Sequence, residues 1–259
     1  SRGILHSARS SSRFLVATLV VIGLVAASCG DDDGASGEVV VFAAASLTNA
    51  FTELGDAFSE QYTGVAVTFS FAASSELVAQ LIEGAPADVF ASADLNNMSK
   101  LTDAEANTGE PVVFANNLSQ IAVAPGNPLG ITGVTDLAND DLILVVCAPQ
   151  VPCGTYASQI FENAEVTVNP DSFEESVRSV LSKVTLGEAD AGIVYATDII
   201  AAGDDADGVD IPADINVVAE YPISVTAEAP NAAGAQAFVD FVLSETGQDI
   251  LAGYGFSSP

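Results

Sequence analysis

The chain has 259 residues, 49% of them apolar, which is enough for the buried core of one large domain or two small ones. Its 35 acidic residues outnumber six basic ones, and three of those six lie at positions 2, 9 and 13. The remaining chain sets three basic residues against 35 acidic ones, a net charge of −32, and such a surface excludes nucleic acid and anionic lipid as partners.

The first 28 residues have the pattern of a secretory signal. Arginines precede a short apolar run at residues 14–27, which is too short to span a membrane comfortably, and small residues follow. The sequence AASCG resembles a bacterial lipobox, which predicts cleavage before Cys29 and lipidation of its thiol. Residues 29–37 are then a flexible tether. Simple cleavage near Ala27 is the alternative.

The first exported segment predicts a buried strand at residues 39–43 that leads into a helix. Apolar residues recur at helical spacing at Leu47, Phe51, Leu54 and Phe58. Ser46 stands where an N-cap is expected. Because the first backbone N–H groups of a helix lack carbonyl partners, this corner is suited to binding an anion.

The same design recurs in the next segment. Alternating apolar residues predict a strand at 65–71, small residues 72–75 form a corner that contains Ser74, and a short helix follows. A strand at 88–92 and a helix at 96–104 continue the alternation. This order of elements indicates an α/β fold with a largely parallel sheet.

The second half predicts further strands, helices and one exposed acidic loop. Asn169–Ser172 has the composition of a helix start, and the apolar residues Phe173 and Val177 fit the face of the helix that would follow. The remaining predictions are strands at 121–124, 142–147, 192–195, 215–219 and 223–226, helices at 135–138, 154–161, 196–202, 232–243 and 245–254, and a loop at 203–214.

Two cysteines remain in the exported chain, Cys147 and Cys153. A close pair of cysteines in an exported protein favours a disulfide, with two buried thiols as the alternative.

Six short motifs follow one another from about Val39 to Phe256. They are AAASLTNAF (43–51), FAASSEL (71–77), GAPADVFASAD (84–94), VPCGTYA (151–157), GIVYATD (192–198) and YGF (254–256). In this order they resemble the molybdate-binding proteins of bacterial ABC transporters. The resemblance implies a two-lobed type II periplasmic-binding fold, in which each lobe is a mostly parallel sheet flanked by helices. It places lobe 1 at residues 38–116 and 219–259, and lobe 2 at residues 117–218.

The resemblance also implies a ligand-binding set. Ser46 and Ser74 would each offer a hydroxyl and a backbone N–H, Cys153 and Val177 a backbone N–H, and Tyr195 its phenolic hydroxyl. The family usually has alanine at the position of Cys153, which bears on the size of the pocket. All these donors are neutral, so a dianion can be bound without burying a lysine or arginine partner.

The function implied is that of an exported solute-binding lipoprotein, not an enzyme. It would capture molybdate, and tungstate as well, and deliver it to an ABC permease from the outer face of the cytoplasmic membrane. We expect a monomer with no cofactor and no metal site other than the bound oxyanion.

Several alternatives remain open. A receptor of the same fold could bind sulfate, phosphate or a small carboxylate, and Arg178 could clamp a carboxylate, although its apolar neighbours predict that it points outward. A hydrolase using Ser46 or Ser74 lacks a histidine base in the exported chain. A structural lipoprotein without a ligand is the remaining possibility.

Overall fold

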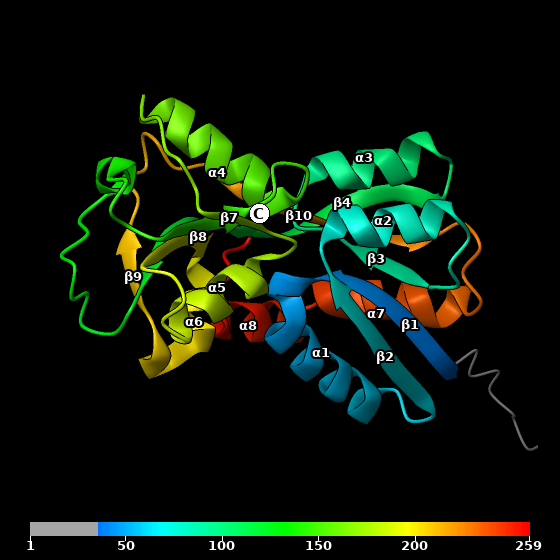
Figure 1. Ribbon diagram of the computed structural model, residues 1–259. Coiled ribbons are helices and arrows are strands. Elements are labelled where there is room, and N and C mark those ends of the chain that lie inside the picture. Colours follow the sequence, from blue (N-terminus) through cyan, green and yellow to red (C-terminus); the bar gives the residue numbers. More distant parts are fainter. Residues whose placement is uncertain (1–35) are drawn as a thin grey trace, which may run out of the picture. The chain divides into compact units, whose positions relative to one another are not determined.

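The computed structural model describes residues 36–259 (Figure 1). The predicted signal segment 1–28, the lipidation site Cys29 and most of the tether 29–37 lie outside the described residues. No helix in the described range is both long and apolar enough to cross a membrane.

Five strands form the first sheet, here called sheet A, in the order β2-β1-β3-β10-β4. Strand β1 pairs in parallel with β2 and β3, whereas β10 pairs antiparallel with β3 and β4. The strands are β1 (Gly37–Ala44), β2 (Val65–Ala72), β3 (Val89–Ala91), β4 (Asn107–Asn117) and β10 (Ala219–Thr226). The associated helices are α1 (Thr48–Gln61), α2 (Ser74–Ile82), α3 (Leu95–Asp103), α7 (Ala232–Leu243) and α8 (Glu245–Gly253). Sheet A and these helices constitute lobe 1.

The second sheet, sheet B, has the strand order β7-β6-β8-β5-β9. Its strands are β5 (Ser119–Val123), β6 (Leu144–Cys147), β7 (Ser172–Glu174), β8 (Ala191–Tyr195) and β9 (Asp207–Asp210). The accompanying helices are α4 (Pro152–Asn163), α5 (Val177–Thr185) and α6 (Ala196–Ala202), with short 3-10 turns at Val134–Ala138 and Gly203–Asp205. Sheet B and these helices constitute lobe 2.

The expected two-lobed α/β architecture is confirmed, but each sheet is mixed rather than mostly parallel. Each contains two parallel and two antiparallel pairings. In sheet A the reason lies in the route of the chain. It leaves along β4 and returns along the neighbouring β10, and adjacent strands that lead out and back must run antiparallel. The chain passes from sheet A to sheet B near residue 117 and returns near residue 218, where the lobe limits were expected. The limits of the lobes as separate bodies stay a prediction.

The packing of α1 explains why the C-terminal segment belongs to lobe 1. Phe51, Leu54 and Phe58 are fully buried, as their spacing predicts. The rings of Phe51 and Phe58 lie 6.0 Å and 5.4 Å from the ring of Phe238 in α7, both edge to face. Aromatic pairs in this geometry add to the apolar burial that joins α1 to α7.

The predicted helix start at Asn169–Ser172 is wrong. Residues Ser172–Glu174 form the edge strand β7, and Phe173 is 56% exposed. Helix α5 begins at Val177, and the Ser176 hydroxyl accepts a bond from the Ser179 N–H at 3.3 Å. Strand pairing with β6 therefore overrides the local helical pattern.

Three other elements differ from prediction. Strand β4 was not expected, because Gly109, Glu110 and Pro111 interrupt its apolar pattern. The acidic loop 203–214 contains the edge strand β9, which pairs with β5. Residues 215–218 are not a strand. Acidic residues such as those of β9 suit an edge, where they discourage pairing with a further strand.

Candidate functional site

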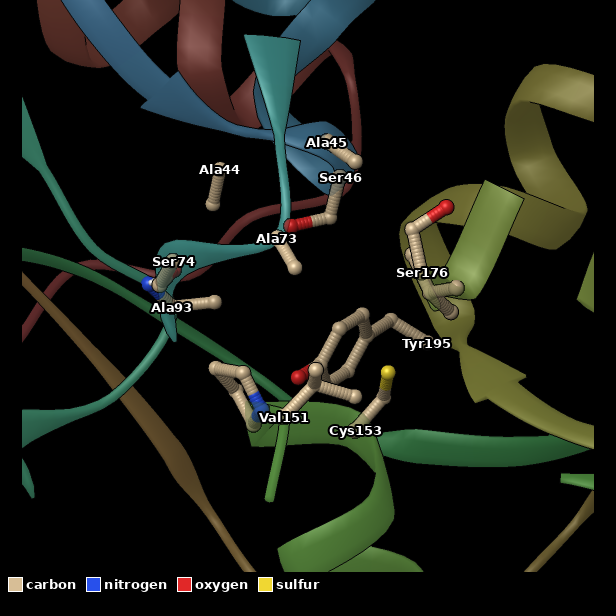
Figure 2. Close-up of a pocket in the computed structure, with 12 residues that line it drawn as sticks. Ala44, Ala45, Ser46, Ala73, Ser74, Ala93, Val151, Cys153, Ser176 and Tyr195 are labelled. Carbon is tan, nitrogen blue, oxygen red and sulfur yellow. Dashed lines mark hydrogen bonds between the residues drawn. The ribbon is translucent and has the colours of Figure 1, made fainter. Parts of the chain in front are cut away.

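A small cavity lies where residues of both lobes meet (Figure 2). It is lined by Ala44, Ala45, Ser46, Ala73, Ser74, Ala93, Val151, Pro152, Cys153, Ser176, Val177 and Tyr195. All five residues of the predicted binding set line it. It offers about 20 Å³ of space to the centre of a water-sized molecule, so the cavity suits a ligand of only a few atoms.

Three helices begin at the cavity wall. Ser74 is the first residue of α2, Cys153 the second of α4 and Val177 the first of α5. The first backbone N–H that bonds to the carbonyl of the capping residue belongs to Glu76 in α2, Gly154 in α4 and Ser179 in α5. The N–H groups of the first helical residues therefore have no carbonyl partner within their helices and carry the positive ends of the helix dipoles.

Ser46 lines the cavity but is not the predicted N-cap. It lies within a short 3-10 turn, Ala45–Leu47, and α1 begins only at Thr48. Its buried hydroxyl is 2.9 Å from the hydroxyl of Tyr221 on β10. The Ser46 hydroxyl is therefore partnered by a tyrosine and not by a helix N–H. Sequence reasoning missed Tyr221 because it is indistinguishable from any other buried strand residue.

Ser74 keeps its proton available for a ligand. Its Oγ accepts the Ala93 N–H at 3.0 Å, in the segment that follows β3, and the side chain is 1% exposed. A serine hydroxyl that accepts from a backbone amide still has its own O–H to donate. The cavity is the open space beside it.

Tyr195 ends β8 and is 2% exposed, with its ring among the lining residues in Figure 2. Its hydroxyl has no hydrogen-bond partner among the described residues. Burial raises the pKa of Tyr195 well above its usual 10, so the group is a neutral O–H donor. A buried hydroxyl that lacks a partner beside a cavity indicates that a ligand or water completes it.

No charged side chain is among the described residues that line the cavity. The same part of the chain has no group of three or more His, Cys, Asp or Glu side chains that could hold a metal ion. The arrangement therefore offers neutral hydrogen-bond donors from several helix starts, which is the chemistry of an anion site rather than a cation site.

The prediction that Arg178 points outward is wrong. From α5 in lobe 2 its guanidinium reaches lobe 1, where Nε donates to the Ala45 carbonyl at 3.4 Å and Nη2 to Asn49 Oδ1 at 3.3 Å. Nε also lies 3.4 Å from Oδ1 of Asp198, a fully buried carboxylate. Arg178 thus sits behind the cavity wall and links the lobes without lining the cavity.

Asp198 supports the wall from the other side. Its Oδ2 accepts the Tyr195 N–H at 3.1 Å, so it fixes the residue that carries the free hydroxyl. Burial raises the pKa of Asp198 to about 6, and the charge of Arg178 opposes that rise.

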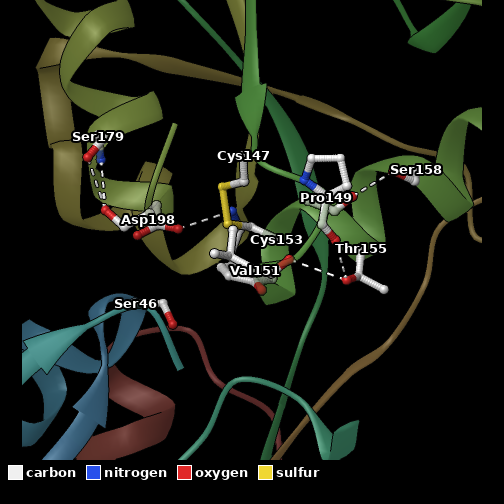
Figure 3. The surroundings of a disulfide bond; sticks show 12 residues. Ser46, Cys147, Pro149, Val151, Cys153, Thr155, Ser158, Ser179 and Asp198 are labelled. Atoms are coloured by element: carbon white, nitrogen blue, oxygen red, sulfur yellow. Dashed lines mark hydrogen bonds between the residues drawn. A yellow bond between two sulfur atoms is a disulfide. The ribbon is translucent and has the colours of Figure 1, made fainter. Parts of the chain in front are cut away.

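The expected disulfide between Cys147 and Cys153 is present, with Cα atoms 5.6 Å apart (Figure 3). It joins the last residue of β6 to the first turn of α4. The loop that carries the Cys153 N–H to the cavity is thereby closed by a covalent bond.

Comparisons with known proteins agree with this geometry. Residues 39–257 match a family model described as bacterial extracellular solute-binding protein. A relative named molybdate-binding protein ModA from Mycobacterium tuberculosis is 42% identical over 95% of this chain and 97% of its own length. The protein of that name from Escherichia coli is 35% identical over 85% of this chain and 89% of its own length. The structure of the periplasmic molybdate-binding protein of Azotobacter vinelandii superposes with a TM-score of 0.77 at 24% identity, covering 85% of this chain and 99% of that one, and shares the fold.

Proposed function

This chain belongs to the bacterial extracellular solute-binding proteins, and from that membership we propose that it captures molybdate in the cavity between its lobes and delivers it to an ABC permease. We extend the proposal to tungstate, a tetrahedral dianion of the same kind. Membership of a solute-binding family makes the chain a binding protein rather than an enzyme.

The observation that carries the proposal is the convergence of uncharged donors on one small cavity. The hydroxyls of Ser46, Ser74 and Tyr195 and the N–H groups of Cys153 and Val177 surround it. Each bond from such a donor to an anion contributes about 1.5–3 kcal/mol before the costs of association. Donors in contact outweigh the many surface carboxylates, because salt screens those charges over about 8 Å.

Titration calorimetry of the purified exported chain tests the proposal. We expect heat on adding molybdate and tungstate, and much weaker binding of sulfate, phosphate and glutamate. Absence of heat with molybdate would contradict the proposal, and tighter binding of sulfate or glutamate would favour the alternative receptor for another anion.

We expect Ser46→Ala to weaken molybdate binding by about 1–3 kcal/mol, because one oxygen of the dianion would lose its donor in a site closed to water. Ser75→Ala is the matched control, since Ser75 is the neighbour of Ser74 and does not line the cavity. Calorimetry on both variants measures the difference. Equal affinities in the two variants would remove Ser46 from the binding set.

We also propose that the exported chain is anchored by a lipid on Cys29, on the basis of the lipobox resemblance alone. A Cys29→Ser chain expressed in a bacterium should move from the membrane fraction to the soluble fraction on cell lysis. Retention of the variant on membranes to the same extent as the parent chain would count against the anchor.

A further inference from the structure

A buried hydrogen-bond chain leads from the crossover between the lobes to the Ser46 hydroxyl. Asn117 is the last residue of β4, and its Nδ2 lies 3.4 Å from the Tyr221 hydroxyl. The Tyr221 hydroxyl in turn lies 2.9 Å from Ser46 Oγ. Asn117 is 3% exposed and Tyr221 is fully buried, so water does not compete for these bonds.

The direction of this chain follows from its first member. The Leu118 backbone N–H, which can only donate, donates to Asn117 Oδ1 at 3.0 Å. The amide nitrogen of Asn117 must therefore face the other way, toward the Tyr221 hydroxyl and toward Thr197 Oγ1, 2.8 Å distant. An amide nitrogen also only donates, so the Tyr221 oxygen accepts.

The remaining protons are then assigned. The buried O–H of Tyr221 needs an acceptor, and of its two partners among the described residues only Ser46 Oγ can accept, so we assign the O–H to Ser46 Oγ. Ser46 consequently does not donate its proton to Tyr221 and keeps it for the cavity that it lines. In the reverse direction Ser46 would donate to Tyr221 and present only lone pairs to an anion.

We propose that Asn117 and Tyr221 are positioning residues that fix the direction of this hydrogen-bond chain and so reserve the Ser46 proton for the bound oxyanion. The inference rests on the proposed function of the cavity. Neither residue lines the cavity, and both act through Ser46. Thr197, at the start of α6, shares the amide of Asn117, so the same device ties lobe 2 to the binding serine of lobe 1.

Reversing the direction of these hydrogen bonds is the direct test. In Asn117→Asp a carboxylate, which only accepts, faces Tyr221, so Tyr221 donates to it and its oxygen is left to accept the proton of Ser46. We expect molybdate affinity to fall roughly 100-fold, because a donor is lost and lone pairs face the dianion. In Tyr221→Phe the Ser46 proton stays free, and we expect a loss of about threefold at most.

The double variant separates this effect from simple charge repulsion. Adding Tyr221→Phe to Asn117→Asp interrupts the series of hydrogen bonds and frees the Ser46 proton. The double variant should therefore bind molybdate about tenfold more tightly than Asn117→Asp alone. If the new carboxylate acted only through its charge, the double variant would bind as weakly as Asn117→Asp, and the proposal would be overturned. Thermal melting without ligand checks that each variant is folded.

A second comparison does not depend on Asn117→Asp folding. Ser46→Ala should lower molybdate affinity by the same factor in the parent chain and in Tyr221→Phe, because Ser46 donates to the ligand in both. A small loss in the parent and a larger one in Tyr221→Phe would mean that Ser46 normally donates to Tyr221, and would overturn the proposal. If the parent chain binds no oxyanion, the proposed function falls with it, whereas normal parent binding with either contrary result removes only the positioning role.

Discussion

Arg178→Met is expected to lower the free energy of unfolding by about 3 kcal/mol near pH 8, as measured by chemical denaturation. The substitution leaves Asp198 ionised and fully buried, with no cation beside it. The estimate is at the lower end for such losses because the Arg178 side chain is 29% exposed and its contacts are long. Loss of the bonds to Ala45 and Asn49 also removes a link between the lobes.

The size of this effect should depend on pH in a defined direction. The pKa of Asp198 is raised from 3.8 to about 6, so the folded state takes up its proton at a higher pH than the unfolded state. The contribution of Asp198 to stability therefore rises as pH falls through 6. In Arg178→Met the pKa is raised further, so the difference from the parent chain should be largest above pH 6 and smaller at pH 5, where a protonated Asp198 needs no partner.

Two controls accompany this prediction. Lys183→Met removes the more exposed ion pair with Glu174 and should cost less than about 1 kcal/mol. Arg178→Met combined with Asp198→Asn should regain most of the lost stability, because no buried charge remains. A loss in Arg178→Met that is independent of pH and persists in the double variant would show that packing, not charge, is what Arg178 supplies.

Gly154→Ala is expected to lower the free energy of unfolding by about 2–3 kcal/mol and to weaken molybdate binding about tenfold. A Cβ at this position would overlap the Ala148 carbonyl and lie 2.7 Å from the Cys147 carbonyl oxygen. Both are backbone groups of the disulfide-closed loop, so the start of α4 must shift. The Cys153 N–H moves with it, away from the cavity.

Gly253→Ala is the matched control for this substitution. Gly253 is the last residue of α8, and an added Cβ meets nothing within 4 Å. Alanine has the higher helix propensity, so stability should be unchanged or raised by a few tenths of a kcal/mol. Thermal melting and calorimetry measure both effects. A Gly154→Ala protein with normal binding would mean that the position of the α4 start is not critical to the site.

The predicted site residues came together because their placement depends on local features. Ser74 and Cys153 lie at or beside helix starts that small residues and apolar periodicity mark in the sequence, whereas the helix of Val177 was expected to start earlier, at Asn169–Ser172. Periodicity did not show that the five predicted binding residues belong to one cavity. That prediction came from the order of motifs shared with a known family. That these residues bind the oxyanion stays a prediction.

The errors share one cause, which is pairing between distant segments. The segment around Phe173 became an edge strand because β6 is its neighbour, and the segment 107–117 became a strand because β10 lies beside it. Ser46 is bonded to Tyr221, which is 175 residues away in sequence. Arg178 turned toward Asp198 of the neighbouring helix α6 and toward Ala45, which comes within its reach only where the lobes meet.

By itself the sequence determined the alternation of strands and helices, the buried face of α1 and the helix starts near Ser74 and Cys153. These follow from the spacing of apolar residues and from unpaired N–H groups, which are properties of a few consecutive residues. Only the tertiary structure decided the mixed sheets, the ion pair behind the cavity and the pairing of the Ser46 hydroxyl with Tyr221. Those depend on which distant donors and acceptors meet in a buried space, where every polar group must find a partner.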